Sequence, residues 1–516
     1  MFSVSGIRNF NKSCGIIGRC HAGKSTLLEA FELGTRYLSI CSTDKPSQGP
    51  DVAVGLATDL GKNAATPGTA LRLQMPLFGD DRLVTIADIF RTVAVPASIA
   101  VEEIDIESIE DEDALADGAG ADEVASELVA LPEHAKWLSD ARSQVGLCHV
   151  IDAFSTSSSP DELAAQIARE NQRIRRIFRA ADREFLDRRG PPMRRKNPAL
   201  FDNELGPALA AILAELAKDT QPFGKSDQEQ SRLRKLVHGD AASTTSEAVV
   251  PAVISNQLLS TKGIVTLVNV QAEHLADCLD KFKCLKNVVA EASDAAKKSG
   301  EPASSGDSSN LSKMCQQIEK GKIHVISAQL ESDLAQMRLD EAEMQDDSTP
   351  EVAEQRDNQT TTKAPTAVPF SPLRLPSSRS PFAVEYLASY GLKPQQQEQL
   401  LSSLLHTGLR QTALSLKAYY TAGEMEARAW LYPSDWRIDQ AAGVIHRDFA
   451  STFNAALVWP YEAIVRDRRK DSTAKLKCGK DHTMSDGDIV EFQLNQNSSA
   501  VRKTSKQQSS QRSARA

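Results

Sequence analysis

Short apolar segments recur along the first 340 residues, separated by longer amphipathic or polar stretches. These mostly aliphatic runs predict buried strands at 13–18, 70–78, 98–106, 146–154, 263–270 and 323–328. Apolar residues at helical spacing predict an amphipathic helix over 24–38. Because strands alternate with helical segments, the pattern predicts an α/β fold with a mostly parallel sheet.

A charged helical stretch interrupts this alternation from about 160 to 245. Its Gly-Pro-Pro sequence at 190–192 is expected to break the helix. The pattern therefore predicts a helical hairpin inserted between two strands of the sheet. We divide this part of the chain into a first α/β part at 1–154, a helical insertion at 155–260 and a second α/β part at 261–339.

Polar, proline-bearing sequence precedes the C-terminal part of the chain. Residues 340–380 are too poor in apolar groups to offset the entropy of ordering, so we predict a linker there. We predict a separate small domain over 381–495 and a basic, disordered tail over 496–516. Two further segments, 41–70 and 295–313, are typical of loops or insertions.

The composition limits the classes of protein. With 41% hydrophobic residues in 516, several cores can form. A net charge of -9 argues against general coating of nucleic acid. The eight cysteines include no C-x-x-C pair, which favours reduced thiols over disulfides or a zinc site. We expect a cytoplasmic monomer without a cleaved presequence or a membrane segment.

Residues 18–25, GRCHAGKS, lie between the first predicted strand and the first predicted helix. They match the phosphate-loop pattern G-x-x-x-x-G-K-[ST]. Gly18 and Gly23 allow the backbone to curl so that its amides face phosphate oxygens. We expect Lys24 to hold the β- and γ-phosphates as the catalytic cation, Ser25 to bind Mg²⁺ and Thr26 to lie near the α-phosphate. The predicted nucleotide contacts are Gly18, Arg19, Cys20, His21, Ala22, Gly23, Lys24, Ser25 and Thr26. The alternatives are a chance match to the motif and, for His21, an exposed side chain without a role.

Three C-terminal segments resemble one family. "LKAYYTAGEMEARAW" (416–430), "QAAGVIHRDFASTFNAALV" (440–458) and "SDGDIVEFQLN" (485–495) are similar to the C-terminal region of the Obg-like ATPases, the YchF family. Shorter similarities are found at 76–90, 104–108, 146–154, 267–275 and 325–334. The resemblance implies a P-loop G domain, a coiled-coil insertion, a C-terminal β-grasp (TGS) domain, binding of ATP and less well of GTP, and association with ribosomes.

The resemblance also implies residue roles. Asp105 would serve Mg²⁺, Asn269 would contact the purine, and Ser327 and Ala328 would form the family's Ser-Ala loop. The first switch needs a threonine for Mg²⁺; Thr69 is our candidate, and Thr66 is equally compatible with the sequence. Two ordinary loop threonines are the alternative.

Several positions depart from the family pattern. Ser108 stands where a glycine amide would sense the γ-phosphate, and the acidic sequence around it repels a triphosphate. Ala272 replaces the acid of the base-recognition motif, and Glu273 follows one residue late. Glu273 is our candidate for the base contact, which a one-residue bulge would bring to the ring. The family's histidine in the loop after 146–154 is missing, and His149 is interpreted as a core residue. We therefore expect this chain to retain nucleotide binding to a greater extent than nucleotide hydrolysis.

Ten basic residues lie between Arg173 and Lys196. Arg173, Arg176 and Arg179 (or Arg183) recur at three- and four-residue steps, which predicts a positive helix face that contacts ribosomal or transfer RNA. A solvated face without a partner is the alternative.

The sequence thus predicts a nucleotide-binding P-loop protein, a slow ATPase or GTPase of Obg-like type associated with ribosomes. The alternative is a catalytically degenerate relative that acts as a ribosome, RNA or protein adaptor. An RNA-binding protein with a vestigial P-loop is a third reading.

Overall fold

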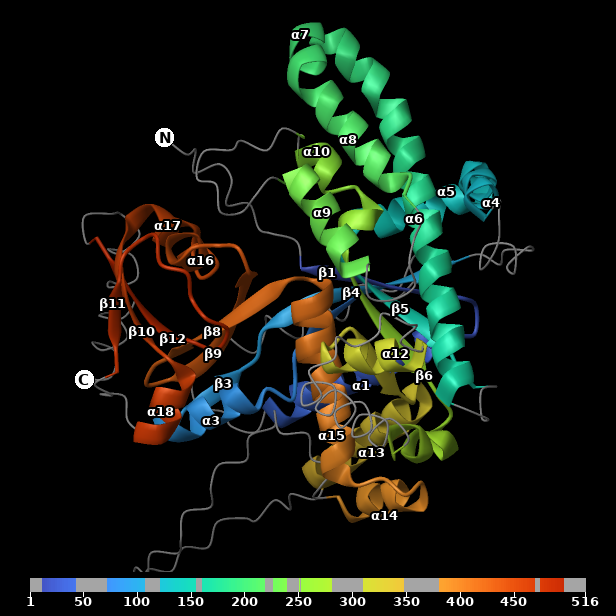
Figure 1. Cartoon of the computed structure of the whole chain (residues 1–516). Helices are drawn as coiled ribbons and strands as arrows, with labels where there is room; N and C mark the ends of the chain where they lie inside the picture. The colour runs from blue at the N-terminus through green and yellow to red at the C-terminus, as the bar shows by residue number, and fades with distance from the viewer. Residues whose placement is uncertain are drawn as a thin grey trace, which may run out of the picture.

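The computed structural model contains two β-sheets and a long helical projection (Figure 1). It describes residues 12–42, 72–106, 121–154, 160–218, 226–238, 250, 252–280, 310–347, 380–468 and 474–495. Most of the predicted loop segments at 41–70 and 295–313, most of the predicted linker and the predicted tail lie outside the described residues.

The first sheet has the strand order β2-β4-β1-β5-β6-β7. Neighbouring strands are parallel, except that β2 is antiparallel to β4. This confirms the predicted α/β fold with a mostly parallel sheet. The strands are β1 (Ser13–Gly18), β2 (Arg72–Pro76), β4 (Ser98–Asp105), β5 (Gly146–Asp152), β6 (Gly263–Asn269) and β7 (Ile323–Ile326).

Helices cover both faces of this sheet, because adjacent residues of a strand point to opposite sides. Ile16 belongs to the core under α1 and α13, whereas Ile17 packs with α4, α5 and α6. A helix at 272–280 follows β6. The covering helices are α1 (Lys24–Ser42), α4 (Ala121–Ala130), α5 (Pro132–Ser143), α6 (Pro160–Lys196), α12 (Asn310–Glu319) and α13 (Ala328–Asp347).

The helical insertion lies between β5 and β6, as predicted, and projects away from the sheet (Figure 1). It has a core of its own, which includes Leu186, Leu209 and Ile212. After α6 its elements are α7 (Pro198–Leu200), the π-helical η3 (Phe201–Leu205), α8 (Gly206–Leu216), α9 (Ser226–His238), α10 (Ala252–Ser255) and the 3₁₀-helical η4 (Leu259–Thr261).

The predicted break at 190–192 is wrong, because α6 continues through Pro191 and Pro192. The carbonyl groups that these prolines leave without an N–H partner belong to Asp187 and Arg188. Both residues are exposed, so water can satisfy those carbonyls. The chain turns instead at Asn197, whose side chain accepts a hydrogen bond from the Leu200 amide at 3.2 Å.

The C-terminal domain is a β-grasp with the strand order β11-β10-β12-β8-β9-β3. The first and last of its own strands, β8 and β12, are parallel neighbours, and α16 packs on the sheet through Ile438 and Ala441. Its elements are β8 (Leu416–Ala422), β9 (Glu426–Pro433), α16 (Ile438–Ala442), α17 (Arg447–Thr452), β10 (Phe453–Trp459), α18 (Tyr461–Asp467), β11 (Leu476–Cys478) and β12 (Ile489–Leu494).

The edge strand of this second sheet comes from the first part of the chain. β3 (Val93–Val95) pairs in parallel with β9, and α3 (Asp81–Phe90) packs beside it (Figure 1). Because β3 directly precedes β4, the two sheets share one continuous stretch of chain.

Buried and half-buried polar groups join the two domains at the same place. Arg82 and Arg410 both donate to the carboxylate of Asp486, the former at 3.0 Å, and the Tyr420 hydroxyl donates to Asp80 at 2.8 Å. Burial would raise the pKa of Asp486, but the hydrogen bond from Arg410 and the two positive charges hold that pKa well below its usual value. We name Asp80, Arg82, Arg410, Tyr420 and Asp486 the interdomain cluster.

Three helical elements connect the domains and pack on the first sheet. They are α14 (Pro381–Ser389), α15 (Pro394–Ser403) and the π-helical η6 (Leu404–Ala413). The end of η6 approaches the sheet where β5 and β6 begin. A Cβ atom at Gly146 or at Gly263 would lie 2.2 Å from the carbonyl oxygen of Ala413. Glycine is therefore required for this close contact.

We predict that Gly263→Ala lowers the free energy of unfolding by about 2 kcal/mol, because backbone atoms of η6 cannot yield to the added methyl group as a side chain would. Calorimetric melting of the full chain measures the effect. Gly479→Ala is the matched control, since a Cβ atom there meets nothing within 4 Å. Equal melting of the two variants would contradict the prediction.

Candidate functional site

The phosphate-loop sequence forms a tight turn between β1 and α1. His21 and Gly23 have positive φ angles of 62° and 91°. A Cβ atom at Gly23 would lie 2.1 Å from the side-chain nitrogen of Asn269, and one at Gly18 would lie 2.6 Å from the Val150 carbonyl oxygen. Both glycines of the motif are thus required by close contacts.

The ammonium group of Lys24 occupies the inside of this turn. It donates to the carbonyl oxygens of Gly18 and Arg19 at 3.1 and 2.8 Å and forms an ion pair with Asp105 at 3.0 Å. These three oxygens match the three N–H donors of a lysine. The side chain of Lys24 is 3% exposed and that of Asp105 is 67% exposed, so Asp105 is the partner that can leave without unfolding the loop.

Ser25 contacts Glu103, an acid that was not among the predicted site residues. Its hydroxyl donates to Glu103 Oε1 at 2.8 Å. Glu103 and Asp105 are two residues apart on β4 and therefore lie on one face, the face toward α1. Strand alternation in "EEID" was the signal that could have identified Glu103.

Asn269 lies behind the loop and is 1% exposed. Its side-chain nitrogen donates to the Ala22 carbonyl oxygen at 2.9 Å, and its side-chain oxygen accepts from the Ala328 amide at 2.8 Å. Asn269 therefore joins the phosphate loop to the Ser-Ala segment. The amide nitrogen carries a second N–H that this contact does not use.

The other predicted nucleotide contacts differ in exposure. Ser327 is buried, and its hydroxyl accepts from the Leu330 amide at 3.4 Å at the start of α13. Glu273 is exposed on the helix at 272–280, whereas Ala272, at the position expected to hold an acid, is buried. Around the loop, Ala22 is buried and Thr26 is half-buried; the exposed side chains are those of Arg19, Cys20 and His21.

The first-switch candidates and the position expected to sense the γ-phosphate lie outside the described part of the chain. These are Thr66 and Thr69, Ser108, and most of the acidic segment around it.

His149 is buried in β5. Burial lowers its pKa to about 4, although a hydrogen bond with Asn171 opposes that change. The imidazole therefore lies in the core as interpreted.

The helical insertion contacts the phosphate loop directly. Arg19 forms an ion pair with Glu170 of α6, and Glu170 also lies 3.6 Å from Arg173. The prediction that this arginine face lies on the surface is wrong, because Arg173, Arg176 and Arg179 are at most 9% exposed. Arg179 donates to the Glu215 carbonyl oxygen at 2.7 Å. Helical spacing marked the packed side of α6, where arginine stems bury against neighbours.

The remaining basic residues of this range reach solvent near the far end of α6. The exposed ones are Arg188, Arg189, Arg194, Arg195 and Lys196. Two of them are already paired with acids, Arg188 with Glu184 and Arg194 with Asp202 at 3.0 Å. The net positive charge at the tip is therefore smaller than the sequence indicates.

The oxygen atoms of Ser25, Glu103 and Asp105 are of the hard type that Mg²⁺ binds. In the described part of the chain, no group of three or more His, Cys, Asp or Glu side chains is placed to hold a metal. Mg²⁺ at nucleotide sites takes one or two protein carboxylates and completes its shell with phosphates and water. The donors thus fit a magnesium ion that arrives with a nucleotide.

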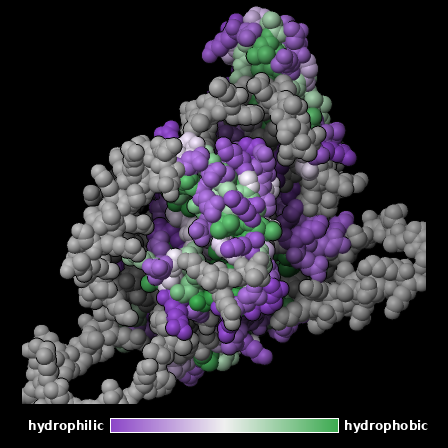
Figure 2. Space-filling view, turned by 90° about the vertical axis from the view of Figure 1, so that its left-hand side faces the viewer, coloured by the Kyte–Doolittle hydropathy of each residue, from purple (hydrophilic) through white to green (hydrophobic). Residues whose placement is uncertain are grey.

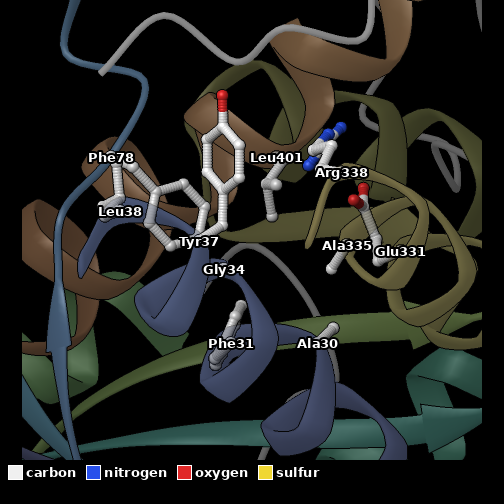
Figure 3. Close-up of a pocket in the computed structure, with 10 residues that line it drawn as sticks. All are labelled: Ala30, Phe31, Gly34, Tyr37, Leu38, Phe78, Glu331, Ala335, Arg338 and Leu401. Atoms are coloured by element: carbon white, nitrogen blue, oxygen red, sulfur yellow. The ribbon is translucent and has the colours of Figure 1, made fainter. Parts of the chain in front are cut away.

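A cavity of about 20 Å³ lies between α1, α13 and α15, away from the phosphate loop (Figure 3). Glu331 and Arg338 of α13 line it among mostly apolar residues. Gln397 donates to Glu331 Oε1 at 2.6 Å. Burial raises the pKa of Glu331 to about 7, although the charge of Arg338 and this hydrogen bond oppose the rise. The cavity has room for about one water molecule and none for a nucleotide.

A curled loop with an enclosed lysine, between the first strand and first helix of such a sheet, defines the P-loop class of α/β domains. None of the helices that the structure describes has the length and apolar character needed to cross a bilayer.

Comparison with known proteins gives matches in the C-terminal domain and beyond. The family described as YchF-GTPase_C, a protein of unknown function (DUF933), matches residues 416–495. Obg-like ATPase 1 of Xenopus laevis is 34% identical over 112 residues, which cover 20% of this chain and 27% of that protein. The ribosome-binding ATPase YchF of Escherichia coli O157:H7 is 32% identical over 115 residues, which cover 22% and 30%. The chain thus matches less than a third of the length of these relatives.

The structure of the Schizosaccharomyces pombe YchF GTPase aligns with 94% of this chain and 99% of its own, at 18% identity and a TM-score of 0.46. Residues 416–495 thus match the YchF family model, and the curated relatives that resemble this chain are YchF or Obg-like ATPases.

We predict that Glu331→Gln weakens the pH dependence of stability. Because the pKa of Glu331 is raised in the folded state, the folded protein holds this proton more tightly than the unfolded chain does. The free energy of unfolding therefore falls as pH rises from about 4.5 to about 7. Between pH 5 and pH 8 the wild type should lose roughly 2 kcal/mol more than the variant. Urea unfolding at both pH values measures this difference. The exposed Glu385→Gln on α14 is the control, and equal pH dependence in all three proteins would refute the role of Glu331.

Proposed function

We propose that this chain binds ATP or GTP with Mg²⁺ at residues 18–25 and hydrolyses it slowly, as a ribosome-associated protein of the cytoplasm. The observation that carries the proposal is the enclosure of the Lys24 ammonium by the carbonyls of Gly18 and Arg19. The names of two relatives, Obg-like ATPase and ribosome-binding ATPase, support the class of activity and of partner.

In this proposal the amides of the loop and the start of α1 face the phosphates. Lys24 exchanges its contact with Asp105 for phosphate oxygens, while its contacts to the two carbonyls keep it in place. Ser25 is the hydroxyl ligand of the metal, and Glu103 or Asp105 is the nearby carboxylate; Thr69 is the first-switch candidate. A bound Mg²⁺ supplies charge that offsets the negative charge of the phosphates.

For the base, the second N–H of Asn269 is the proposed donor to the purine ring, with Glu273 and the Ser327–Ala328 segment beside it. The burial of Ala272 supports weaker discrimination between adenine and guanine than an acid there would provide.

A specific observation favours the alternative of a nucleotide-independent adaptor. All three donors of Lys24 are satisfied by the protein itself, and Arg19 is held by Glu170. A loop so satisfied is stable without a ligand, as a former nucleotide site would be.

The tip of the insertion is the proposed contact for a ribosome or RNA, together with the TGS-like domain. Its hydrophilic side chains surround a small hydrophobic area (Figure 2). The exposed Leu200 and the basic residues at 188–196 support a mixed contact with protein and phosphate.

We predict that Lys24→Ala lowers the affinity for ATP and GTP at least tenfold, because a full positive charge on the phosphates is lost. Titration calorimetry of the full chain with Mg²⁺ measures affinity, and co-sedimentation with ribosomes measures association. The exposed Lys480→Ala is the control. If neither affinity nor association changes in Lys24→Ala, the adaptor reading replaces the proposal.

A further inference from the structure

Two carboxylates of β4 reach the start of α1, and they have different partners. Glu103 accepts the hydroxyl hydrogen of Ser25 at 2.8 Å, and Asp105 lies 3.0 Å from the Lys24 ammonium. We infer that Glu103, and not Asp105, is the acid that positions Ser25 for a magnesium–nucleotide complex. Asp105 acts as a counter-ion that Lys24 releases when a phosphate enters. The inference rests on the proposed function.

The hydrogen-bond direction at Ser25 carries the first step. A serine hydroxyl has one hydrogen to donate and two lone pairs. A hydroxyl that binds a hard cation must turn its lone pairs to the metal and its hydrogen to another acceptor. Glu103 is that acceptor in this structure. The arrangement therefore orients the oxygen of Ser25 before any metal is bound.

The strand register explains why Glu103 contacts Ser25 while Asp105 contacts Lys24. In the pairing of β1 with β4, Ile16 is opposite Glu103 and Gly18 is opposite Asp105. Two residues along a strand span about 6.6 Å, so Glu103 lies deeper in the sheet by that distance. The longer glutamate side chain reaches from there to Ser25. Asp105, at the end of the strand, lies beside the mouth of the loop.

Asp105 cannot keep its present contact when a phosphate binds. The ammonium of Lys24 has no further donor to offer once two carbonyls and Asp105 are bound. An entering phosphate must take the place of the carboxylate, which also repels it. Because the Asp105 side chain is 67% exposed, it can turn into water at small cost.

The test compares three alanine variants of the full chain: Glu103→Ala, Asp105→Ala and Glu102→Ala. Glu102 is the matched control, since it lies on the opposite face of β4 and accepts from Gln144 at 2.9 Å. ATP and GTP are titrated calorimetrically in Mg²⁺ and again in EDTA. Mn²⁺ with ADP provides a second readout, the electron paramagnetic resonance of the bound metal.

In EDTA, Glu103→Ala is expected to bind nucleotide with the affinity of the wild type. The increase in affinity that Mg²⁺ produces should be roughly tenfold smaller in this variant than in the wild type. Asp105→Ala is expected to keep that gain and to bind nucleotide several-fold more tightly in EDTA, because a competing negative charge is gone. The bound Mn²⁺ spectrum should change in Glu103→Ala alone.

The reverse pattern, with the Mg²⁺ gain lost in Asp105→Ala and kept in Glu103→Ala, would overturn the inference while leaving the proposed function intact. An unchanged gain in all three variants would overturn it as well. A wild type that binds neither nucleotide in either buffer would instead refute the proposed function, and the inference with it.

Discussion

A buried ammonium group needs oxygen atoms around it, because an unpaired charge in the protein interior costs several kcal/mol. Lys24 meets this requirement with two carbonyls of its own loop and one carboxylate of β4. These three oxygens meet at the ammonium group only if β1 ends at Gly18, the chain turns at Gly23, and β4 pairs with β1 in the observed register. Much of the first domain serves to hold these oxygens in position.

Residues from distant parts of the chain also hold the phosphate loop in position. Asn269, at the end of β6, fills the space that a side chain at Gly23 would occupy and ties the loop to the beginning of α13. Glu170 reaches the loop from the inserted helix through Arg19. The phosphate loop therefore contacts both the second half of the sheet and the insertion, so that movement of either changes the surroundings of the same few residues.

The C-terminal domain is joined to the strand that carries the acids. β3 completes the β-grasp sheet at its edge and leads into β4, which holds Glu103 and Asp105. The interdomain cluster, with Asp486 between Arg82 and Arg410, fixes the neighbouring α3 against that domain. Charged groups enclosed in this way are costly to separate, since each would lose its partner. The two sheets are thus coupled through a short segment of chain.

Local patterns were sufficient to predict several features of this protein. Apolar runs predicted the strands of the first sheet, and residue spacing identified the phosphate loop. The resemblance of the C-terminal segments to the Obg-like ATPases indicated the β-grasp domain. The same patterns misjudged the proline pair in α6 and the arginines at 173–179, and they passed over Glu103 and the pairing of β3 with β9. The physical reason is that periodicity assigns a residue to a face of a helix or strand without saying what covers that face. The covering residues often come from a distant part of the chain. Only packing therefore decides whether an arginine is exposed to solvent or a glutamate contacts Ser25.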